Sequence, residues 1–307
     1  MHTCQFSWER LLAARTMFRW AAFVLIVVAS SPTAAAQLVR TQGKVARDLV
    51  YRTVNGKRLA LDLYVPAEAK DGDKFPVVVW IHGGAWRAGD KSQCPGIPLV
   101  SRGFVVASIS YRLSSEAIFP AQIHDCKAAI RWLRASAGRF PIDPDRIGVW
   151  GASAGGHLAA LLGTSGDVKA LEGGPDNLKY SSRVQAVCDY FGPTDFLRMN
   201  DIPGAMDHNA ADSPESALIG GAIQKNPDKV ARANPITYVS PDDPPFLILH
   251  GDQDRTVPPN QSELLHDALK KAGVQVRLGI VTGAGHGFTP GADKTAFAFF
   301  EKVLKGR

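Results

Sequence analysis

The chain has 307 residues, of which 45% are hydrophobic and 21% are charged. This composition excludes wholesale disorder and provides enough apolar surface for one domain with a sizeable core. The formal net charge of +6 arises from 35 basic and 29 acidic residues without a long basic run, so nucleic-acid binding is not indicated.

The N-terminal segment is typical of an export signal. A segment with several arginines precedes the apolar run Trp20 to Ala29, and a small-residue cleavage site follows at Ala34 to Ala36. We therefore expect a signal peptide over residues 1–36 and a secreted or periplasmic domain over residues 37–307. A retained membrane anchor is the alternative, which the run fits less well because a spanning helix needs about 20 apolar residues. A start at Met17 is a second open alternative.

Four cysteines limit the possible disulfides. Cys4 would leave with the signal peptide, so that Cys94, Cys126 and Cys188 remain. Their spacing matches no zinc pattern. In an oxidising compartment, one disulfide with one thiol left over and a set of buried free thiols are equally good expectations.

The first strands of the domain are expected to be antiparallel. The segment Lys44 to Val65 contains the turn signal Asn55-Gly56, which is typical of a β-hairpin. In its second arm, every other residue from Leu59 to Val65 is a leucine or a valine, which predicts a strand with one buried face.

Six continuous apolar runs follow, and such runs are typical of parallel strands covered on both faces. They are Val77–Ile81, Gly103–Ile109, Ile147–Trp150, Val184–Tyr190, Phe246–His250 and Val276–Val281. Helix-like segments lie between and after them, at Ala121–Ala135, His157–Gly163, Gln261–Ala272 and Thr295–Leu304. This alternation predicts an α/β fold with a mostly parallel, doubly wound sheet, whose reactive groups lie at the carboxyl ends of the strands.

A nucleophile pattern follows the third apolar run. Residues 151–155 read Gly-Ala-Ser-Ala-Gly and match G-x-S-x-G between a strand and a helix, which is the context that this pattern requires. The glycines permit a sharp turn that presents the Ser153 hydroxyl, which needs a base nearby because it is a weak nucleophile alone. We expect His157, on the following helix, to pack there rather than to serve as that base.

The segment His82 to Trp86 follows the first apolar run and is a variant of the HGGG sequence that forms oxyanion holes. Small residues let backbone amides approach a substrate oxygen. The donors that we expect are the amides of Gly84, Ala85 and Ala154. Gly83 in place of Gly84 is an open alternative. His82 is expected to orient the loop by a hydrogen bond, and Trp86 to line the substrate pocket, with packing in the core as an equally good alternative.

Two later segments supply an acid and a base. In the segment His250 to Pro258 the second aspartate, Asp254, is the expected partner of a catalytic histidine, whereas Asp252 is expected to bond backbone amides of the turn. His286 stands between glycines on a loop after the last run. The sequence therefore predicts a triad in the order typical of α/β-hydrolases, namely Ser153, Asp254 and His286.

This triad predicts nucleophilic catalysis. His286 would take the Ser153 proton during attack on an ester carbonyl, and Asp254 would hold the tautomer of the imidazole. Water would then cleave the acyl-enzyme, so that neither a metal nor an organic cofactor is required.

Several strings resemble a known family: WIHGGAWRAGDKS, DPDRIGVWGASAGGHLAALLGTSG, NPITYVSPDDPPFLILHGDQDRTVP and GAGHGF. They are similar to α/β-hydrolases with a bifunctional feruloyl and acetyl-xylan esterase (BD-FAE-like) domain and, more distantly, to hormone-sensitive-lipase-like carboxylesterases. The resemblance runs from about Val45 to the end. It implies an α/β-hydrolase catalytic domain over residues 37–307 and a small-molecule or carbohydrate ester as substrate. Ala85 departs from the family pattern, which has a third glycine there.

The stretch Asp195 to Val239 breaks the alternation and is rich in Gly, Pro and Asp. In the fold that the resemblance implies, an insertion at this place is expected to form a small cap over the site. Ser213-Pro214-Glu215 is typical of a helix start. Four apolar side chains of the insertion are expected in the core, with the lining of a pocket as the alternative: Met199, Ile202, Met206 and Leu218. Because no long apolar lid is visible, short acyl chains are the expected substrates.

Two other functions compete with an esterase. An amidase, formamidase or peptidase would use the same machinery on a different bond. A non-catalytic binding protein on the same scaffold would be expected to lack a member of the triad, whereas all three are present here. The acyl group, the alcohol and the oligomeric state are not fixed by the sequence.

Overall fold

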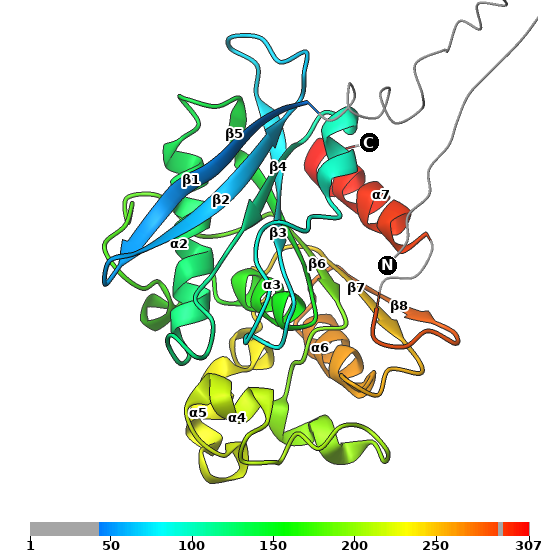
Figure 1. Ribbon diagram of the computed structural model, residues 1–307. Helices are drawn as coiled ribbons and strands as arrows, with labels where there is room; N and C mark the ends of the chain where they lie inside the picture. The colour runs from blue at the N-terminus through cyan, green and yellow to red at the C-terminus, as the bar shows by residue number, and fades with distance from the viewer. Residues whose placement is uncertain (1–42, 288–290, 307) are drawn as a thin grey trace, which may run out of the picture.

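The computed structural model describes residues 43–287 and 291–306. The expected signal peptide and its boundary lie outside the described residues. Eight strands form one sheet in the order β1-β2-β4-β3-β5-β6-β7-β8 (Figure 1). The strands are β1 Lys44–Val54, β2 Lys57–Val65, β3 Phe75–Ile81, β4 Val105–Ile109, β5 Ile142–Ala152, β6 Ala186–Tyr190, β7 Phe246–Gly251 and β8 Val276–Val281.

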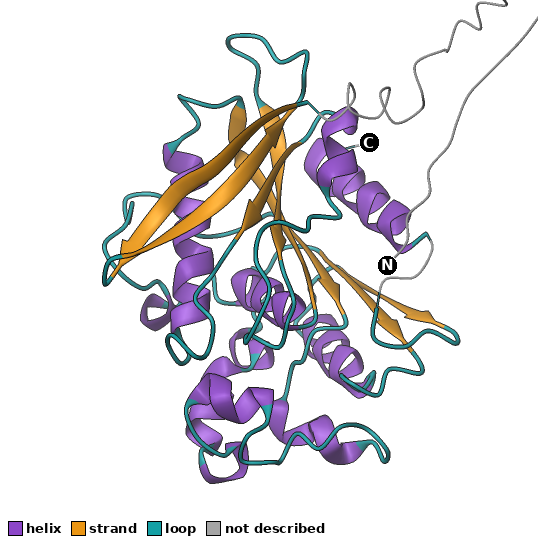
Figure 2. Ribbon diagram, in the orientation of Figure 1, coloured by secondary structure: helices purple, strands orange, loops and turns teal. Residues whose placement is uncertain are grey.

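Helices cover both faces of this sheet (Figure 2). They are α2 Ala121–Ala135, α3 Ala154–Thr164, α6 Asn260–Lys271 and α7 Ala292–Lys305, with the 3-10 helix η1 at Ile97–Arg102. One apolar core joins the sheet to α2, α3 and α6, and a second core joins its other face to η1 and α7. Strands β3 to β8 pair in parallel, whereas β1–β2 and β2–β4 are antiparallel. The predicted α/β-hydrolase fold is therefore confirmed.

The predicted hairpin is also confirmed. Asn55 and Gly56 connect β1 and β2 with φ of 49° and 79°, the left-handed values that a tight hairpin turn requires. The prediction that only one face of β2 is buried is wrong. Asp62 and Tyr64, on the face opposite the leucines, are buried too. Asp62 is compensated by Arg47, 3.1 Å away, and by Lys91, 2.8 Å away, so the carboxylate does not need water on that face.

Strand β8 departs from its predicted burial on both faces. It is the last strand of the sheet, pairs only with β7 among the described strands, and is partly exposed along its length, with Ile280 44% exposed. An apolar run alone does not distinguish an edge strand from a central strand, because the neighbours that cover it are set by topology. Helix α7 covers this face of the sheet only as far as β7, and a cavity lies where the cover ends.

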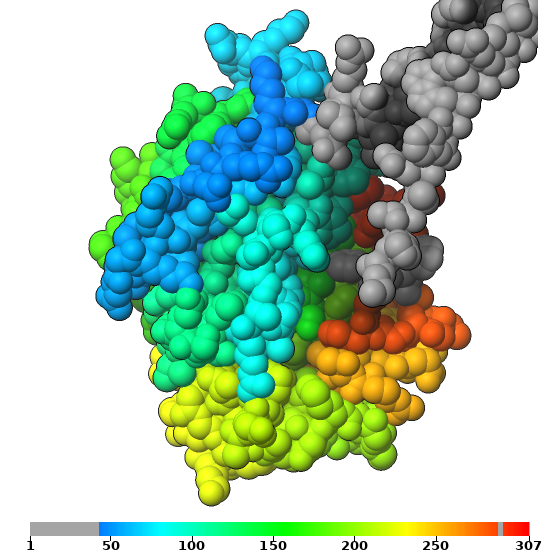
Figure 3. Space-filling model, viewed as in Figure 1, coloured from blue at the N-terminus to red at the C-terminus, as the bar shows by residue number. Residues whose placement is uncertain are grey.

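The insertion, residues 195–239, lies at the lower end of the molecule (Figures 1 and 3), and its buried apolar residues belong to the same core as α2, α3 and α6. Its elements are η3 Phe196–Asp201, α4 Pro214–Ile219, η4 Ile223–Lys225, α5 Pro227–Ala233 and η5 Pro235–Tyr238. The predicted helix start is confirmed, because the Ser213 side chain accepts a hydrogen bond from the amide of Ser216 and proline follows it. Met199 and Leu218 are in the core as expected, whereas Met206 is 43% exposed.

The three cysteines of the described chain, Cys94, Cys126 and Cys188, are free thiols. Of the two expectations for them, the structure supports free thiols. Within residues 43–287 and 291–306, no group of three His, Cys, Asp or Glu side chains is placed to hold a metal ion. No helix in these ranges has the length and apolar character needed to cross a membrane.

Candidate active site

Ser153 lies on a strained turn between β5 and α3. Its φ of 56° and ψ of −123° are rarely adopted by a residue with a side chain. The turn closes only because its flanks are glycines. A Cβ on Gly151 would lie 2.0 Å from the Gly155 carbonyl oxygen, and a Cβ on Gly155 would lie 2.1 Å from the Ile81 carbonyl oxygen. Because both glycines lack a Cβ, the turn packs closely against the end of β3. The Ser153 hydroxyl therefore lies at the carboxyl end of the sheet.

The three residues predicted as a triad are brought together. His286 Nε2 lies 3.0 Å from Ser153 Oγ, and His286 Nδ1 lies 2.7 Å from Asp254 Oδ2. A carboxylate accepts only, so Nδ1 carries the proton and Nε2 is the acceptor for the serine hydroxyl. This is the arrangement that allows an imidazole to take the Ser153 proton.

Asp254 is buried and is held as a carboxylate by several donors. Its Oδ1 accepts hydrogen bonds from the amides of Thr256, at 2.8 Å, and Val257, at 2.9 Å. Burial alone would raise the pKa of Asp254, but hydrogen bonds from His250, His286 and the Val257 amide outweigh burial and hold that pKa well below its usual range. The segment that carries Asp254, residues 251–258, is called the acid turn below.

The prediction that Asp252 bonds backbone amides of its own turn is partly correct. Its Oδ1 accepts a hydrogen bond from a backbone amide, as expected, but the donor is Gly283 at 2.7 Å, on the loop that carries His286. A second bond runs from the amide of Gln253 to the carbonyl of Ala284, at 2.9 Å. The acid turn and the histidine loop are therefore joined along their backbones as well as through Asp254 and His286.

Residues 82–88, called the oxyanion loop below, lie against the serine turn. A Cβ on Gly83 would lie 2.9 Å from the Ala152 carbonyl oxygen and 3.3 Å from Ser153 Cβ. Gly84, Ala85 and Trp86 all have positive φ, at 102°, 55° and 55°. Such a run of left-handed residues turns successive amides toward one side, as in backbone anion sites.

The amides expected as oxyanion donors are not engaged elsewhere. Among the described residues, no hydrogen bond uses the amide of Gly84, Ala85 or Ala154. Ala154 is also the first residue of α3, where the helix dipole favours a developing negative charge. Three backbone donors near Ser153 are thus available for a substrate oxygen.

His82 holds the start of the oxyanion loop, as predicted. Its Nδ1 lies 2.7 Å from the Gly83 carbonyl oxygen. Its ring stacks on Tyr111 with a centroid distance of 4.3 Å, and the Tyr111 hydroxyl donates to the His82 carbonyl at 3.0 Å. Burial lowers the pKa of His82, although its bond to Gly83 opposes this shift. The neutral ring is therefore favoured in this position.

The far end of the oxyanion loop is tied to the insertion. The Arg87 guanidinium donates to the carbonyl of Asp212 and, at 2.8 Å, to the carbonyl of Ser213. In the space-filling view, the insertion lies directly against the loop that follows β3 (Figure 3). The far end of the loop is therefore anchored to the insertion as well as by its own backbone bonds to the Gly84 carbonyl.

The expectation that Trp86 lines the substrate pocket is wrong, and its alternative, packing in the core, is correct. The side chain is 1% exposed and does not line the cavity at Ser153. Its ring packs edge-on against His157, with centroids 5.2 Å apart, and at 5.6 Å against Phe196 of η3. The positive φ at Trp86 turns the indole away from the substrate and into the contact between α3 and the insertion.

His157 packs in the core, as predicted. It is fully buried, and its Nε2 lies 2.8 Å from the Ala233 carbonyl oxygen at the end of α5. Burial lowers the pKa of His157 to about 4, so the ring is neutral near pH 7. His157 thus joins the nucleophile helix to the insertion, and it contacts Ser153 through the helical backbone bond from its amide to the Ser153 carbonyl, at 3.0 Å, rather than through its ring.

A cavity of about 650 Å³ opens at Ser153 and His286. Several of its lining residues were not identified from the sequence: Trp80, Asp90, Ser92, Gln93, Phe191 and Thr256. No residue of the insertion lines it, so the expectation that the insertion covers the site is wrong. Phe191 follows β6, and its ring lies 4.7 Å from that of His286. Its place at the carboxyl end of a parallel strand is the one sequence signal that would have found it.

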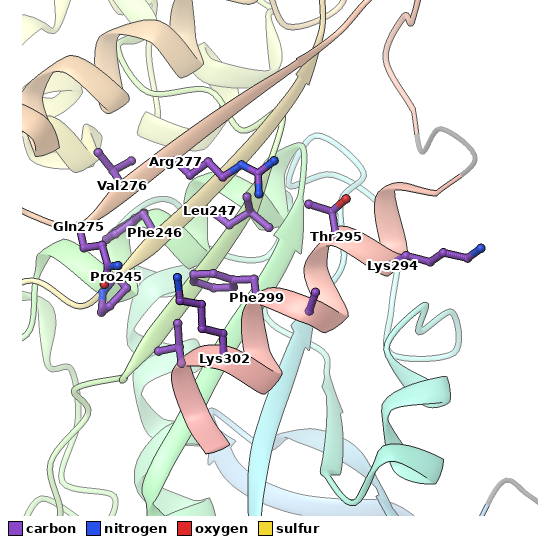
Figure 4. Close-up of a pocket in the computed structure, with 12 residues that line it drawn as sticks. Pro245, Phe246, Leu247, Gln275, Val276, Arg277, Lys294, Thr295, Phe299 and Lys302 are labelled. Carbon is purple, nitrogen blue, oxygen red and sulfur yellow. The ribbon is translucent and has the colours of Figure 1, made fainter. Parts of the chain in front are cut away.

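A second cavity, of about 740 Å³, lies between β7, β8 and α7, where the cover of the sheet ends (Figure 4). Phe299 and Leu247 face it, together with the cationic side chains Arg277 and Lys302. Its described lining contains no serine, cysteine, histidine or carboxylate. It therefore lacks the histidine and carboxylate partners that a serine-type site requires and is not the candidate active site.

Comparisons with known proteins agree with this geometry. The BD-FAE family model matches residues 61–269, more than half of the chain. A curated relative, esterase LipQ of Mycobacterium tuberculosis, is 34% identical over 238 residues, which cover 76% of this chain and 55% of LipQ. The chain spans about half the length of the curated relatives it matches.

Two solved structures extend the comparison to three dimensions. A truncated carbohydrate esterase from gut microbiota has a TM-score of 0.78 and 36% identity, over 86% of this chain and 98% of that protein. Esterase 2 of Thermogutta terrifontis with bound butyrate has a TM-score of 0.67 and 28% identity, over 86% of this chain and 93% of that esterase.

Proposed function

Because the chain belongs to the BD-FAE family of α/β-hydrolases, we propose that it is a serine hydrolase that cleaves carboxylic esters. The observation that carries this proposal is the hydrogen-bond chain from Asp254 through His286 to Ser153, beside three backbone amides that have no partner among the described residues. The named relatives are esterases, and this supports an ester rather than an amide as the bond that is cleaved.

The first half of the reaction forms an acyl-enzyme. Ser153 Oγ attacks the ester carbonyl carbon while His286 Nε2 takes the hydroxyl proton. The carbonyl oxygen becomes negative and is bound by the amides of Gly84, Ala85 and Ala154. Each such donor contributes roughly 3 kcal/mol to transition-state stabilisation. The imidazolium then protonates the leaving alcohol, and Asp254 stabilises its positive charge.

The second half releases the acid. A water molecule gives its proton to His286 and attacks the acyl carbon, and the collapse of this intermediate returns the proton to Ser153. The buried carboxylate of Asp254 stays ionised through both halves, because its donors hold its pKa far below neutrality. The imidazole is therefore the group whose protonation changes in each cycle.

We further propose that the acyl group is short and that the alcohol is a carbohydrate. The cavity at Ser153 combines the aromatic rings of Trp80 and Phe191 with the polar side chains of Asp90 and Gln93. Aromatic faces with nearby hydrogen-bonding groups suit a sugar ring, and the absence of insertion residues from the lining leaves room for a large alcohol. The likeness to a carbohydrate esterase supports this assignment.

A panel of substrates tests the proposal. We expect hydrolysis of p-nitrophenyl acetate, butyrate and feruloyl esters and of acetylated xylan, with little turnover of matched anilides. A fluorophosphonate probe should label the wild type and not Ser153→Ala, which should also lose ester turnover. Preference for anilides would identify an amidase instead, and labelling that persists in Ser153→Ala would remove Ser153 as the nucleophile. Preference for long-chain triglycerides would contradict the short acyl group.

Export is a separate proposal. The arginines and the apolar run ahead of Gln37 are typical of a signal peptide, and a carbohydrate ester would be met outside the cytoplasm. Mass spectrometry of protein recovered from the periplasm or the medium should give a mature chain that begins near Gln37. An intact N-terminus in a membrane fraction would support the anchor instead.

A further inference from the structure

His250 contacts the proposed triad without belonging to it. It stands near the end of β7, directly before the acid turn, and is 1% exposed. Its Nε2 lies 2.8 Å from the Val257 carbonyl oxygen and 3.2 Å from Asp254 Oδ2. That carboxylate oxygen is the one that His286 also uses. Two histidines therefore converge on one oxygen atom of Asp254.

The contacts of His250 fix which nitrogen carries its proton. Nε2 faces two oxygen atoms that only accept, so it must be the N–H donor. Nδ1 lies 2.7 Å from Ser262 Oγ, on the first turn of α6, and accepts the hydroxyl proton. Ser262 therefore holds the ring in the tautomer that donates toward the acid turn.

The second partner of this N–H lies on the same turn as Asp254. Val257 accepts from His250 through its carbonyl and donates through its amide to Asp254 Oδ1. His250 thus joins the backbone of the turn and the carboxylate in one closed set of hydrogen bonds. This set leaves Oδ2 directed at His286 and restricts rotation of the Asp254 side chain.

Among the described residues, no other side chain forms a hydrogen bond with the ring of His250. Phe191 packs edge-on against it, with ring centroids 6.3 Å apart, and also packs against His286. Asp189 lies close enough for the histidine to lower its pKa, but its recorded hydrogen bond comes from the amide of Gly192. The ring of His250 is thus committed to Ser262 on one side and to the acid turn on the other.

We propose that His250 is a positioning residue for the reaction, which sets the orientation of Asp254 and through it the imidazole of His286. This inference rests on the proposed ester hydrolysis. Loss of the His250 N–H would let the carboxylate rotate, and a displacement of about 1 Å in a catalytic group costs up to about 100-fold in rate. His250 does not line the cavity at Ser153, so substrate binding should be spared.

The test is a double-mutant cycle between His250→Phe and Asp254→Asn. Asparagine keeps an oxygen for the amides of Thr256 and Val257 but replaces the shared Oδ2 by a donor. Alone, His250→Phe should lower kcat on p-nitrophenyl acetate by about 10- to 100-fold with KM unchanged within about two-fold. In the Asp254→Asn background it should cause no further loss, because the two residues act as one unit.

Further variants keep the test conclusive if His250→Phe does not fold. His250→Gln retains a donor and should recover part of kcat. Ser262→Ala should lower kcat by about two- to five-fold, and this loss should also vanish with Asp254→Asn. His266→Phe, at a partly exposed position of the same helix α6 that faces Asp267, should leave kcat and KM unchanged. Near-ultraviolet circular dichroism of each variant reports the fold.

The outcomes separate the two proposals. If wild-type protein hydrolyses esters but the losses from His250→Phe and Ser262→Ala are equally large in both backgrounds, His250 acts on the fold alone and the inference is wrong. A rise in KM without a fall in kcat would also overturn it. If the wild type hydrolyses no ester in the panel, the proposed function fails, and the role of His250 falls with it.

Discussion

The acid turn and the oxyanion loop both lie beside Ser153, but different contacts hold them. The acid turn is fixed by its own side chains, since Asp254 bonds two amides of the same turn and faces two histidines. The oxyanion loop presents backbone donors to the substrate, and it is held by its own bonds from the amides of Arg87 and Ala88 to the Gly84 carbonyl and by contacts with Tyr111 and the insertion. The acid turn is thus held around a buried carboxylate, whereas the oxyanion loop is held by backbone bonds and by contacts with the insertion.

The largest effect should come from the acid turn. Asp254→Asn should reduce kcat by about 10⁴-fold, because the amide stabilises the wrong tautomer of His286 and cannot stabilise the imidazolium. KM should change little, since Asp254 does not line the cavity. Steady-state kinetics with an aryl acetate measures both constants. A loss of less than ten-fold would show that the turn does not act through its carboxylate.

Gly83→Ala should have the next largest effect, through the oxyanion loop. The added Cβ would meet the Ala152 carbonyl oxygen at 2.9 Å, so the loop must move away from the serine turn. We expect kcat to fall by about 100-fold, comparable to the loss of one oxyanion donor. Gly138→Ala is the matched control, because its Cβ would meet no atom within 4 Å. Unchanged turnover in Gly83→Ala would mean that the loop tolerates displacement.

A pair of arginines compares the two halves directly. Arg87 bonds carbonyls of the insertion from the oxyanion loop, and Arg255 bonds the Pro203 carbonyl of the insertion from the acid turn, at 3.1 Å. Arg87→Ala should lower kcat by about ten-fold, since its guanidinium ties that end of the loop to the insertion. Arg255→Ala should stay within about two-fold, because Asp254 is held independently. Equal losses of kcat in the two variants would show that the acid turn and the oxyanion loop depend on the insertion to the same extent.

Substitution of Asp189, which lies beneath the serine turn, should have the smallest effect on activity. Its effect on the free energy of unfolding should depend on pH. Burial raises the pKa of Asp189 to about 7 from an unfolded value of 3.8, with His250 and the Gly192 amide acting in the opposite direction. A raised pKa in the folded state means that the native protein binds the proton more tightly. Its contribution to stability is present below pH 3.8 and is lost as the pH rises through about 7.

Asp189→Asn removes this titration and keeps an acceptor for Gly192. The difference in unfolding free energy between the variant and the wild type should therefore rise between about pH 4 and pH 8. Comparison with the wild type is needed because His157, whose pKa is lowered to about 4, contributes a dependence of opposite sign in part of this range. Urea unfolding at several pH values measures the difference. A constant difference would exclude a buried titrating carboxyl.

The sequence predicted the chemical residues better than their surroundings. The structure brings together Ser153, Asp254 and His286, which were predicted because nucleophile, acid and base chemistry restricts the residue type and because each follows a strand. Phe191 also follows a strand, but a pocket wall needs only an apolar surface, and so no residue type marks it. His250 was seen only as part of a segment, because its role arises from a contact with Ser262 that depends on the position of α6.

The errors in the prediction have a common physical cause. For Trp86 the sequence left the pocket and the core equally open, and a positive φ turns its indole into the core. Strand β8 was expected to be buried because its residues are apolar, yet it lies at the edge of the sheet. The insertion was expected above the site, yet it packs beside it. Each outcome is decided by tertiary packing, to which local patterns are insensitive.

The lateral place of the insertion has a consequence for engineering chimeras of this fold. An insertion that roofs a pocket selects among substrates, whereas one that braces a loop from the side acts on the catalytic step. Transplanting a foreign segment between β6 and β7 should therefore leave the ranking of esters intact and change how fast all of them react. Any such graft must supply carbonyl groups that meet Arg87 and an aromatic ring that meets Trp86.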